Sequence, residues 1–175
     1  MSEKVARFEK VSFEQFLKDI KASVPYLINA REEEIRQIYE DIRLPQRATE
    51  KSAGYDIIAP FDISIPQGQA LVIPTGLRCE IQAGWFLDLT PKSGLGFKTG
   101  SRLANTQGII DADYYDAKNE GHIMAKLINE SVIGPELMQL SKGKAFIQGI
   151  FIPHGITVDD TASGLREGGF GSTNS

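Results

Sequence analysis

The stretch LRCEIQAGWFLDL, residues 77–89, decides the fold class of this 175-residue chain. Apolar and polar residues alternate from Leu77 to Ile81, and the alternation resumes from Trp85 to Leu89 after a Gln-Ala-Gly turn. A period of two is typical of a strand that buries one face, and a turn with glycine reverses the chain within a few residues. The stretch therefore predicts two half-buried strands joined by a tight turn.

The same pattern extends to both sides of this stretch. FDISI at 61–65 alternates in the same way, and the runs HIMAKLINES at 122–131 and KAFIQGIFIP at 144–153 continue it. The segments PQG and PTG supply further turn chemistry. Short alternating strands separated by turns predict an all-β sandwich or barrel, which we expect to form a single domain over residues 1–160.

The first quarter of the chain has helical periodicity instead. Two sets of apolar residues recur at i, i+3, i+4 and i+7, as is typical of amphipathic helices. The sets are Phe13, Phe16, Leu17 and Ile20, and Ile35, Ile38, Tyr39 and Ile42. The expected signals for the helix ends are capping boxes at Ser12 with Gln15 and at Asn29 with Glu32, and a closing proline at Pro45. We expect a helical insertion at 12–44 that covers part of the barrel; docking of a partner protein is the alternative.

The composition argues against several classes of protein. The formal net charge is −4, from 19 basic and 23 acidic residues in mixed order, so a polymeric nucleic acid is not expected as a partner. No apolar run approaches the roughly 20 residues of a membrane helix, and the N-terminal segment lacks the apolar core of a secretion signal. We therefore expect a cytoplasmic protein without a membrane segment.

The cysteine and histidine content argues against two kinds of metal site. Cys79 is the only cysteine, which excludes an internal disulfide and a thiol-based metal cluster and fits a reducing compartment. Its place on an apolar face predicts a small buried hydrophobe rather than a nucleophile. His122 and His154 are too few for a zinc site, so we expect both to be structural or surface residues.

Two segments carry candidate chemistry. TPKSGLGFK at 90–98 places backbone N–H groups, a hydroxyl and an ammonium group in one turn, which suits phosphate oxygens, although such turns are also common structural elements. In NTQGIIDADYYDAKNEGHI at 105–123, Gly108 lets a ligand approach the backbone, and Asp111 follows a short apolar strand. A carboxylate in that place could accept a proton from water or help to hold a metal; a solvated Asp-rich turn is the alternative.

Five segments follow one another along the chain: AGYD at 53–56, PKSGLG at 91–96, GIIDADY at 108–114, GKAFIQGIFIP at 143–153 and REGGFGST at 166–173. Together they resemble the five ordered motifs of the trimeric dUTPases, in particular a branch from bacteria and their phages. The resemblance implies a homotrimer of jelly-roll-like β-barrels with shared active sites. It also implies Mg²⁺-dependent hydrolysis of dUTP to dUMP and pyrophosphate, which keeps uracil out of DNA and supplies dUMP for dTMP synthesis.

The resemblance further implies roles for single residues. Asp111 matches the general base that deprotonates the attacking water, Asp113 a structural carboxylate, and Asp56 the carboxylate that contacts Mg²⁺ through water. Tyr114 matches the tyrosine that stacks on the deoxyribose and excludes a 2′-hydroxyl, and Asn105 belongs to the hairpin that reads uracil. The full set of positions that match substrate-binding residues is Lys92, Ser93, Gly94, Asn105, Gly108, Ile109, Ile110, Tyr114, Met124, Gln148, Arg166, Phe170, Gly171, Ser172 and Thr173.

Residues 161–175 are expected to form a flexible arm. In the family, the matching segment closes over the nucleotide in an active site that neighbouring subunits form. Phe170 would stack on uracil, and Arg166 would clamp the terminal phosphate. The chain departs from the family pattern at Lys92, where arginine is more common, and by the insertion DAKNE at 116–120, which lengthens the uracil hairpin.

Two other functions stay open on the sequence. An enzyme of the dCTP deaminase group would share the fold but would need a glutamate base beside the pyrimidine ring, and the arm with Phe170 argues against it. A regulatory protein that binds dUTP as a signal would dock a partner through the helices of residues 12–44.

Overall fold

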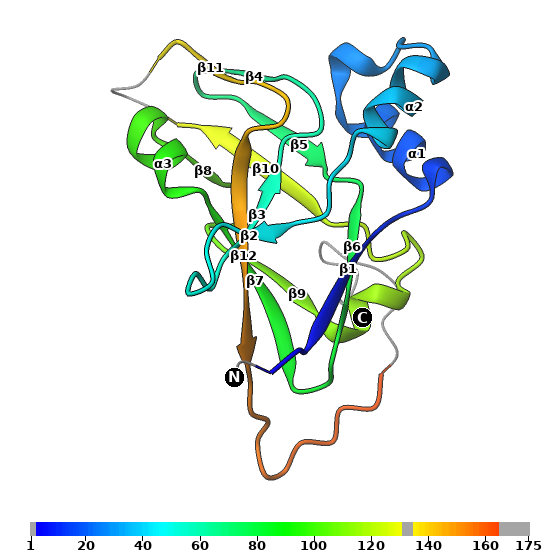
Figure 1. Ribbon diagram of the computed structural model, residues 1–175, viewed down its shortest axis with the longest axis vertical. Helices are drawn as coiled ribbons and strands as arrows, with labels where there is room; N and C mark the ends of the chain where they lie inside the picture. Colours follow the sequence, from blue (N-terminus) through cyan, green and yellow to red (C-terminus); the bar gives the residue numbers. More distant parts are fainter. Residues whose placement is uncertain (1–2, 131–134, 165–175) are drawn as a thin grey trace.

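The computed structural model describes residues 3–130 and 135–164 (Figure 1). Strands are the main secondary structure, and the first two helices lie together at one corner, away from the short helix α3. In chain order the elements are β1 (Ala6–Lys10), α1 (Phe13–Ser23), η1 (Pro25–Leu27), α2 (Glu32–Glu40), β2 (Gln46–Arg47), β3 (Tyr55–Ile58), β4 (Ile63–Pro66), β5 (Ala70–Pro74), β6 (Leu77–Ile81), β7 (Trp85–Pro91), α3 (Ser93–Thr99), β8 (Ser101–Leu103), β9 (Gly108–Asp111), η2 (Ala112–Asp116), β10 (Met124–Asn129), β11 (Leu137–Leu140) and β12 (Ala145–Pro153).

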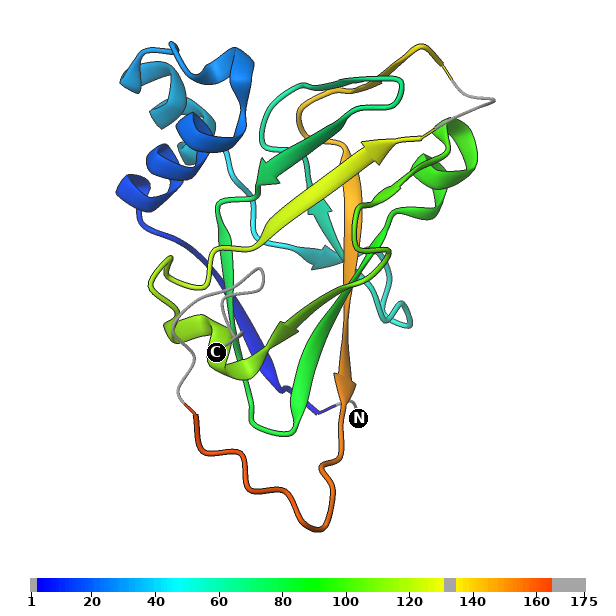
Figure 2. The ribbon, with the colours of Figure 1, turned by 180° about the vertical axis from the view of Figure 1, so that it is seen from behind.

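Within the described residues the strands form four antiparallel sheets (Figures 1 and 2). The largest has the order β2-β3-β12-β7-β9, with the long strand β12 in its centre, and the second has the order β5-β10-β8. The pairs β1-β6 and β11-β4 complete the set. The expected strand-rich fold is present, but these pairings do not close a barrel. The reason is that β9 is an edge strand, and its outer side borders a cavity rather than another strand.

The alternation predicted for residues 77–81 is confirmed, whereas that predicted for residues 85–89 is only partly present. The three apolar residues of β6 are buried, Cys79 among them at 2% exposure, while Glu80 is exposed. In β7, Leu87 and Leu89 are buried as expected, but Asp88 between them is also only 8% exposed. Burial raises the pKa of the Cys79 thiol to about 12, as expected for a core residue rather than a nucleophile.

α1 begins at the predicted cap, but half of the capping box comes from elsewhere. Ser12 Oγ accepts the Gln15 backbone N–H at 3.1 Å. The Ser12 backbone N–H donates to Glu120 Oε2 at 2.7 Å, although these residues are 108 positions apart. Gln15 does not return the contact, because its side-chain amide donates to Asp19 at 2.7 Å.

The predicted ends of the second helix are wrong. Asn29 lies in the turn that follows η1, and α2 begins at Glu32 with Arg31 as its N-cap residue. The Arg31 backbone N–H donates to Glu34 Oε2 at 3.0 Å, and the acidic first turn complements the helix dipole. The helix ends at residue 40, five positions before Pro45, so the proline does not terminate it.

Helices and strands contribute to one hydrophobic core. Phe16 and Ile20 of α1 and Ile35 of α2 are fully buried in the same cluster as the strand residues. Ile42, just beyond α2, packs against Gly76, which has a φ of +73° and no room for a Cβ atom. The helical segment is thus tightly packed on the strands. Among the described residues, no helix has the length and apolar character needed to span a membrane.

Candidate active site

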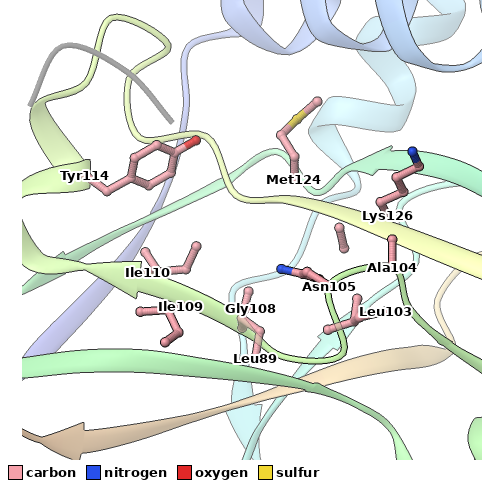
Figure 3. Close-up of a pocket in the computed structure, with 11 residues that line it drawn as sticks. Leu89, Leu103, Ala104, Asn105, Gly108, Ile109, Ile110, Tyr114, Met124 and Lys126 are labelled. Atoms are coloured by element: carbon pink, nitrogen blue, oxygen red, sulfur yellow. The ribbon is translucent and has the colours of Figure 1, made fainter. Parts of the chain in front are cut away.

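A cavity of about 310 Å³ lies between the outer edge of β9, the start of β10 and the turn between β8 and β9 (Figure 3). This volume is at the lower end of the range for small-molecule sites. Six of the positions that match substrate-binding residues line it: Asn105, Gly108, Ile109, Ile110, Tyr114 and Met124. The structure therefore brings together, in one cavity, residues that are spread over 20 positions of the sequence.

The turn between β8 and β9 places Asn105 at the cavity. The Ala104 backbone N–H donates to Lys126 O at 2.8 Å, which ties the start of the turn to β10. Thr106 adopts a left-handed φ of +64°, and the Gln107 N–H donates to Asn105 O at 2.6 Å. This tight turn holds Asn105 with its amide pointing into the cavity, as Figure 3 shows.

Gly108 lets β9 lie close against β7. It is in register with Leu89, and a Cβ atom at this position would come 3.2 Å from Leu89 Cβ. Leu89 itself forms part of the cavity wall. A larger residue at 108 would push β9 away from β7 and change the width of the cavity.

Tyr114 closes one end of the cavity from η2. Its ring is buried, and its hydroxyl donates to His122 O at 2.9 Å and accepts from Asn119 Nδ2 at 2.7 Å. Asp111 is the last residue of β9, directly after the cavity-lining Ile110, and is half-buried. The proposed base thus lies one residue from the cavity wall.

A second group of predicted residues crosses the largest sheet as a row. Asp56 of β3, Gln148 of β12 and Thr90 of β7 are in register, so their side chains share one face. Lys92 Nζ, just after β7, lies 2.5 Å from Asp56 Oδ1. Ser93 follows at the start of α3, and both Lys92 and Ser93 border a second cavity of about 360 Å³.

The polar row lies apart from the first cavity: none of Asp56, Gln148 and Thr90 lines that cavity, although it reaches both faces of β9 through Ile109 and Ile110. Gly149, Leu89 and Gly108 are in register, one position along from Gln148 and Thr90. Side chains alternate between faces along a strand, so the face of Leu89, which lines the cavity, is not the face of Gln148. Within one chain the structure does not bring the two groups of predicted residues into one site.

The remaining predicted residues lie outside the described part of the chain. They are Arg166, Phe170, Gly171, Ser172 and Thr173. The described part of the predicted arm, residues 161–164, has neither helix nor strand and is exposed.

The cavity also includes residues that the sequence analysis did not identify. These are Leu89, Leu103, Ala104, Ala125 and Lys126. Lys126 stands two positions after Met124 on β10, so strand periodicity alone would have placed both side chains on one face. The contribution of Leu103 and Ala104 had no comparable signal, because it depends on the pairing of β8 with β10.

Comparisons with known proteins agree with this geometry. The sequence pattern of the dUTPase family matches residues 40–174. A deoxyuridine 5′-triphosphate nucleotidohydrolase from Lactococcus lactis is 40% identical over 135 residues, which are 75% of this chain and 88% of that protein. One from Rickettsia felis is 38% identical over 137 residues, 74% of this chain and 87% of that protein.

Solved structures show the same relationship. The crystal structure of a dUTPase from Streptococcus mutans matches with a TM-score of 0.59 at 36% identity, over 65% of this chain and 88% of that one. The dUTPase of phage phi11 of S. aureus shares the fold at 17% identity, with a TM-score of 0.64 over 93% of this chain and 98% of that one. On the family match and these relatives, the chain belongs to the dUTPase family.

Proposed function

We propose that the protein is a dUTP diphosphatase, which hydrolyses dUTP to dUMP and pyrophosphate in active sites shared between copies of the chain. The observation that carries this proposal is the cavity between β9 and β10, lined by six residues that match the substrate-binding positions of the family. The names of the homologous nucleotidohydrolases support the same reaction.

The uracil ring would be recognised by the backbone groups on the outer edge of β9 and by the side-chain amide of Asn105. β9 is the last strand of its sheet, so the N–H and C=O groups on its outer edge have no strand partner in the described part of the chain and border the cavity. Asn105 adds an amide with both a donor and an acceptor. Cytosine reverses a donor and an acceptor of uracil, and sites of this kind reject such analogues by about 10⁴-fold or more.

Asp111 is proposed as the general base. It accepts a proton from a water molecule whose oxygen bonds to the α-phosphorus, while the bond from that phosphorus to the bridging oxygen breaks and pyrophosphate leaves. Its position at the end of β9, directly after Ile110, puts a carboxylate beside the cavity that would hold the base and sugar. Positioning and charge neutralisation lower most of the barrier to phosphoryl transfer.

The phosphates would be held by Lys92, Ser93, Gly94 and Gln148, with Mg²⁺ to neutralise their charge when it is bound. Among the described residues, no three His, Cys, Asp or Glu side chains gather in a metal site. That arrangement fits Mg²⁺, which keeps several water ligands and takes further ligands from substrate phosphates. Asp56, half-buried beside Lys92, is the carboxylate proposed to contact the water shell of the ion.

A complete site is proposed to need more than one copy. No residue of the polar row lines the base cavity, so a nucleotide in the cavity of one chain would use the row of another. The face with the polar row also carries Asp88, which is 8% exposed and whose Oδ1 has no hydrogen-bond partner in the described residues. A neighbouring chain that covers this face could satisfy it. We propose the homotrimer of the family, with residues 161–175 as the arm that closes each site.

Subunit complementation tests the shared site. Asp111→Asn and Gln148→Ala disable the two halves separately, and each pure variant should release little pyrophosphate from dUTP. In a randomly mixed oligomer about one quarter of the sites would combine two intact halves, so activity should return to about that fraction. A mixture as inactive as its parents would show that each site lies within one chain. A panel of deoxy- and ribonucleoside triphosphates with the wild-type protein tests the substrate itself.

A further inference from the structure

The N-terminal helical segment contacts the loop of residues 117–123, which joins η2 to β10 next to the nucleotide cavity. We call residues 117–123 the pocket loop. Figure 2 shows α1 next to it. Two hydrogen-bonded pairs of side chains join them, Ser12 with Glu120 and Asp19 with His122, and the ring of Phe16 lies with its centroid 6.1 Å from that of His122. The family match begins only at residue 40, so α1 lies outside the part of the chain that defines the family.

Asp19 determines the tautomer and the orientation of the fully buried imidazole of His122. The Gly76 backbone N–H donates to His122 Nε2 at 2.8 Å, so this nitrogen carries no proton. The proton of the neutral ring therefore lies on Nδ1, which is 2.5 Å from Asp19 Oδ2. Burial acts to raise the pKa of Asp19, but hydrogen bonds from His122 and Gln15 outweigh it and leave the pKa below its ordinary value. The carboxylate is thus charged and holds the ring in one tautomer and orientation.

The second pair anchors the loop just before His122. Glu120 accepts the Ser12 N–H at 2.7 Å and the Ser12 hydroxyl at 2.6 Å. Glu120 and Gly121 both have left-handed φ values, +58° and +66°, so the chain makes a sharp bend there. A Cβ atom at Gly121 would come 2.7 Å from Tyr114 O, which shows how closely the bend packs on η2.

From His122 the contacts lead directly to the cavity wall. The carbonyl of His122 accepts the hydroxyl of Tyr114 at 2.9 Å. The next residue, Ile123, donates its N–H to Leu77 O at 2.8 Å, and the residue after that is Met124. Tyr114 and Met124 both line the cavity (Figure 3). A shift of the imidazole would therefore move the hydrogen-bond acceptor of one wall residue and the backbone of another.

We propose that Asp19, acting through His122, is a positioning residue. It determines the positions of Tyr114 and Met124, and thereby how strongly the site discriminates between deoxyribose and ribose. The inference rests on the proposed function, in which Tyr114 faces the sugar. It assigns the helical segment to the nucleotide site of its own chain. Asp19 itself touches neither the substrate nor the reacting atoms.

The test is the ratio of kcat/KM for dUTP to that for UTP. A mere loss of stability lowers the amount of active protein but leaves this ratio unchanged, whereas a displaced Tyr114 changes it. We expect Asp19→Ala to lower the ratio about tenfold, within the usual range of coupling between distant groups. Asp19→Asn keeps an oxygen that can accept the Nδ1 proton, so it should restore a ratio within about twofold of wild type.

Asp41→Ala is the matched control. Asp41 also joins the helical segment to the turn before β12, through Lys142 Nζ at 2.6 Å, and neither residue lines the cavity. This variant should leave the ratio at the wild-type value. If Asp19→Ala lowers the melting temperature and leaves the ratio unchanged, the contact is structural only and the proposal is wrong.

A second variant covers the case in which Asp19→Ala does not fold. Glu120→Ala removes the other hydrogen-bonded contact between the helical segment and the pocket loop, at a partly exposed position. It should also lower the ratio of kcat/KM for dUTP to that for UTP. An unchanged ratio in Glu120→Ala would then overturn the proposal. Failure of the proposed function gives a different result, because the wild-type protein would not release pyrophosphate from dUTP at all.

Discussion

At the scale of single residues, Asp111 has the most direct part in the proposed chemistry, as the general base. It ends β9 immediately after Ile110, which lines the cavity. On the C-terminal side of Asp111, Asp113 is exposed and Tyr114 is buried against the pocket loop. The order strand, carboxylate, buried aromatic thus places one acidic group directly after the cavity-lining Ile110 and a ring at the end of the cavity.

Asp111→Asn tests this placement. The amide keeps the size of the side chain but cannot take a proton from water, so turnover of dUTP should fall by about 10²–10⁴-fold. The dissociation constant of a non-hydrolysable dUTP analogue, measured by calorimetry, should stay within about threefold of wild type. Asp113→Asn is the matched control and should retain most of the turnover. Near-normal turnover in Asp111→Asn would remove the carboxylate from the mechanism.

At the scale of elements, the helices α1 and α2 are joined to the strands by apolar packing and by charged contacts. Phe16 and Ile20 lie in the shared core. Asp19 and Glu120 provide the charged contacts to the pocket loop, and Asp41 provides another to Lys142. The two kinds of contact respond differently to pH, because only the charged ones depend on ionised carboxylates.

The charged contacts predict an acid-sensitive junction. For Asp19 and Glu120, burial acts to raise the pKa, but hydrogen bonds from His122 and from Ser12 leave both values lowered from 3.8 and 4.5. A carboxylate with a lowered pKa stabilises the fold fully above its unfolded-state pKa, and this stabilisation is lost as the pH falls through the folded-state value. The contribution should therefore be complete above about pH 5 and decline below about pH 4.

Thermal unfolding measures this effect. The melting temperature of the wild-type protein should fall between pH 6 and pH 3.5, and the fall should be smaller in the double variant Asp19→Asn, Glu120→Gln, which has no charge to lose at these positions. Glu33→Gln, at an exposed carboxylate of α2, is the control and should keep the wild-type dependence. Equal pH dependence in all three proteins would rule out these carboxylates as the cause.

At the scale of the whole molecule, the two halves of the proposed site border separate cavities. The register of β12 with β7, and of β7 with β9, places Gln148 on one face and Leu89 on the other. The nucleotide proposed for the cavity would then need the polar row of another copy and an arm to cover it. The quaternary structure is thus part of the proposed catalytic apparatus.

Deletion of residues 165–175 tests the arm. The segment carries the residues that match phosphate- and uracil-binding positions, so its loss should leave the oligomer intact in size-exclusion chromatography and lower kcat about 10²-fold or more. Deletion of residues 174–175 alone removes none of the matched positions and should preserve activity. A full deletion with unchanged kcat would show that these residues do not close the site.

The sequence alone determined several of the strands, the helices α1 and α2, and the family. Alternation within a strand and the period of a helix are local properties, which is why β6, β7 and α1 were predicted correctly from a few residues each. The five ordered motifs identified the dUTPase family, because each motif is a short contiguous segment. Both ends of α2 were predicted wrongly, since Asn29 and Pro45 are only two of several local features that can begin or end a helix.

Only the tertiary structure decided how these elements meet. Glu120 completes the cap of α1 across 108 positions, and Asp19 reaches His122 across 103, which no local pattern encodes. The placement of Gln148 and Leu89 on opposite faces follows from strand register, and a shift of one residue would reverse it. Periodicity specifies which face of an element is apolar, whereas long-range pairing specifies what that face meets, and the site depends on the pairing.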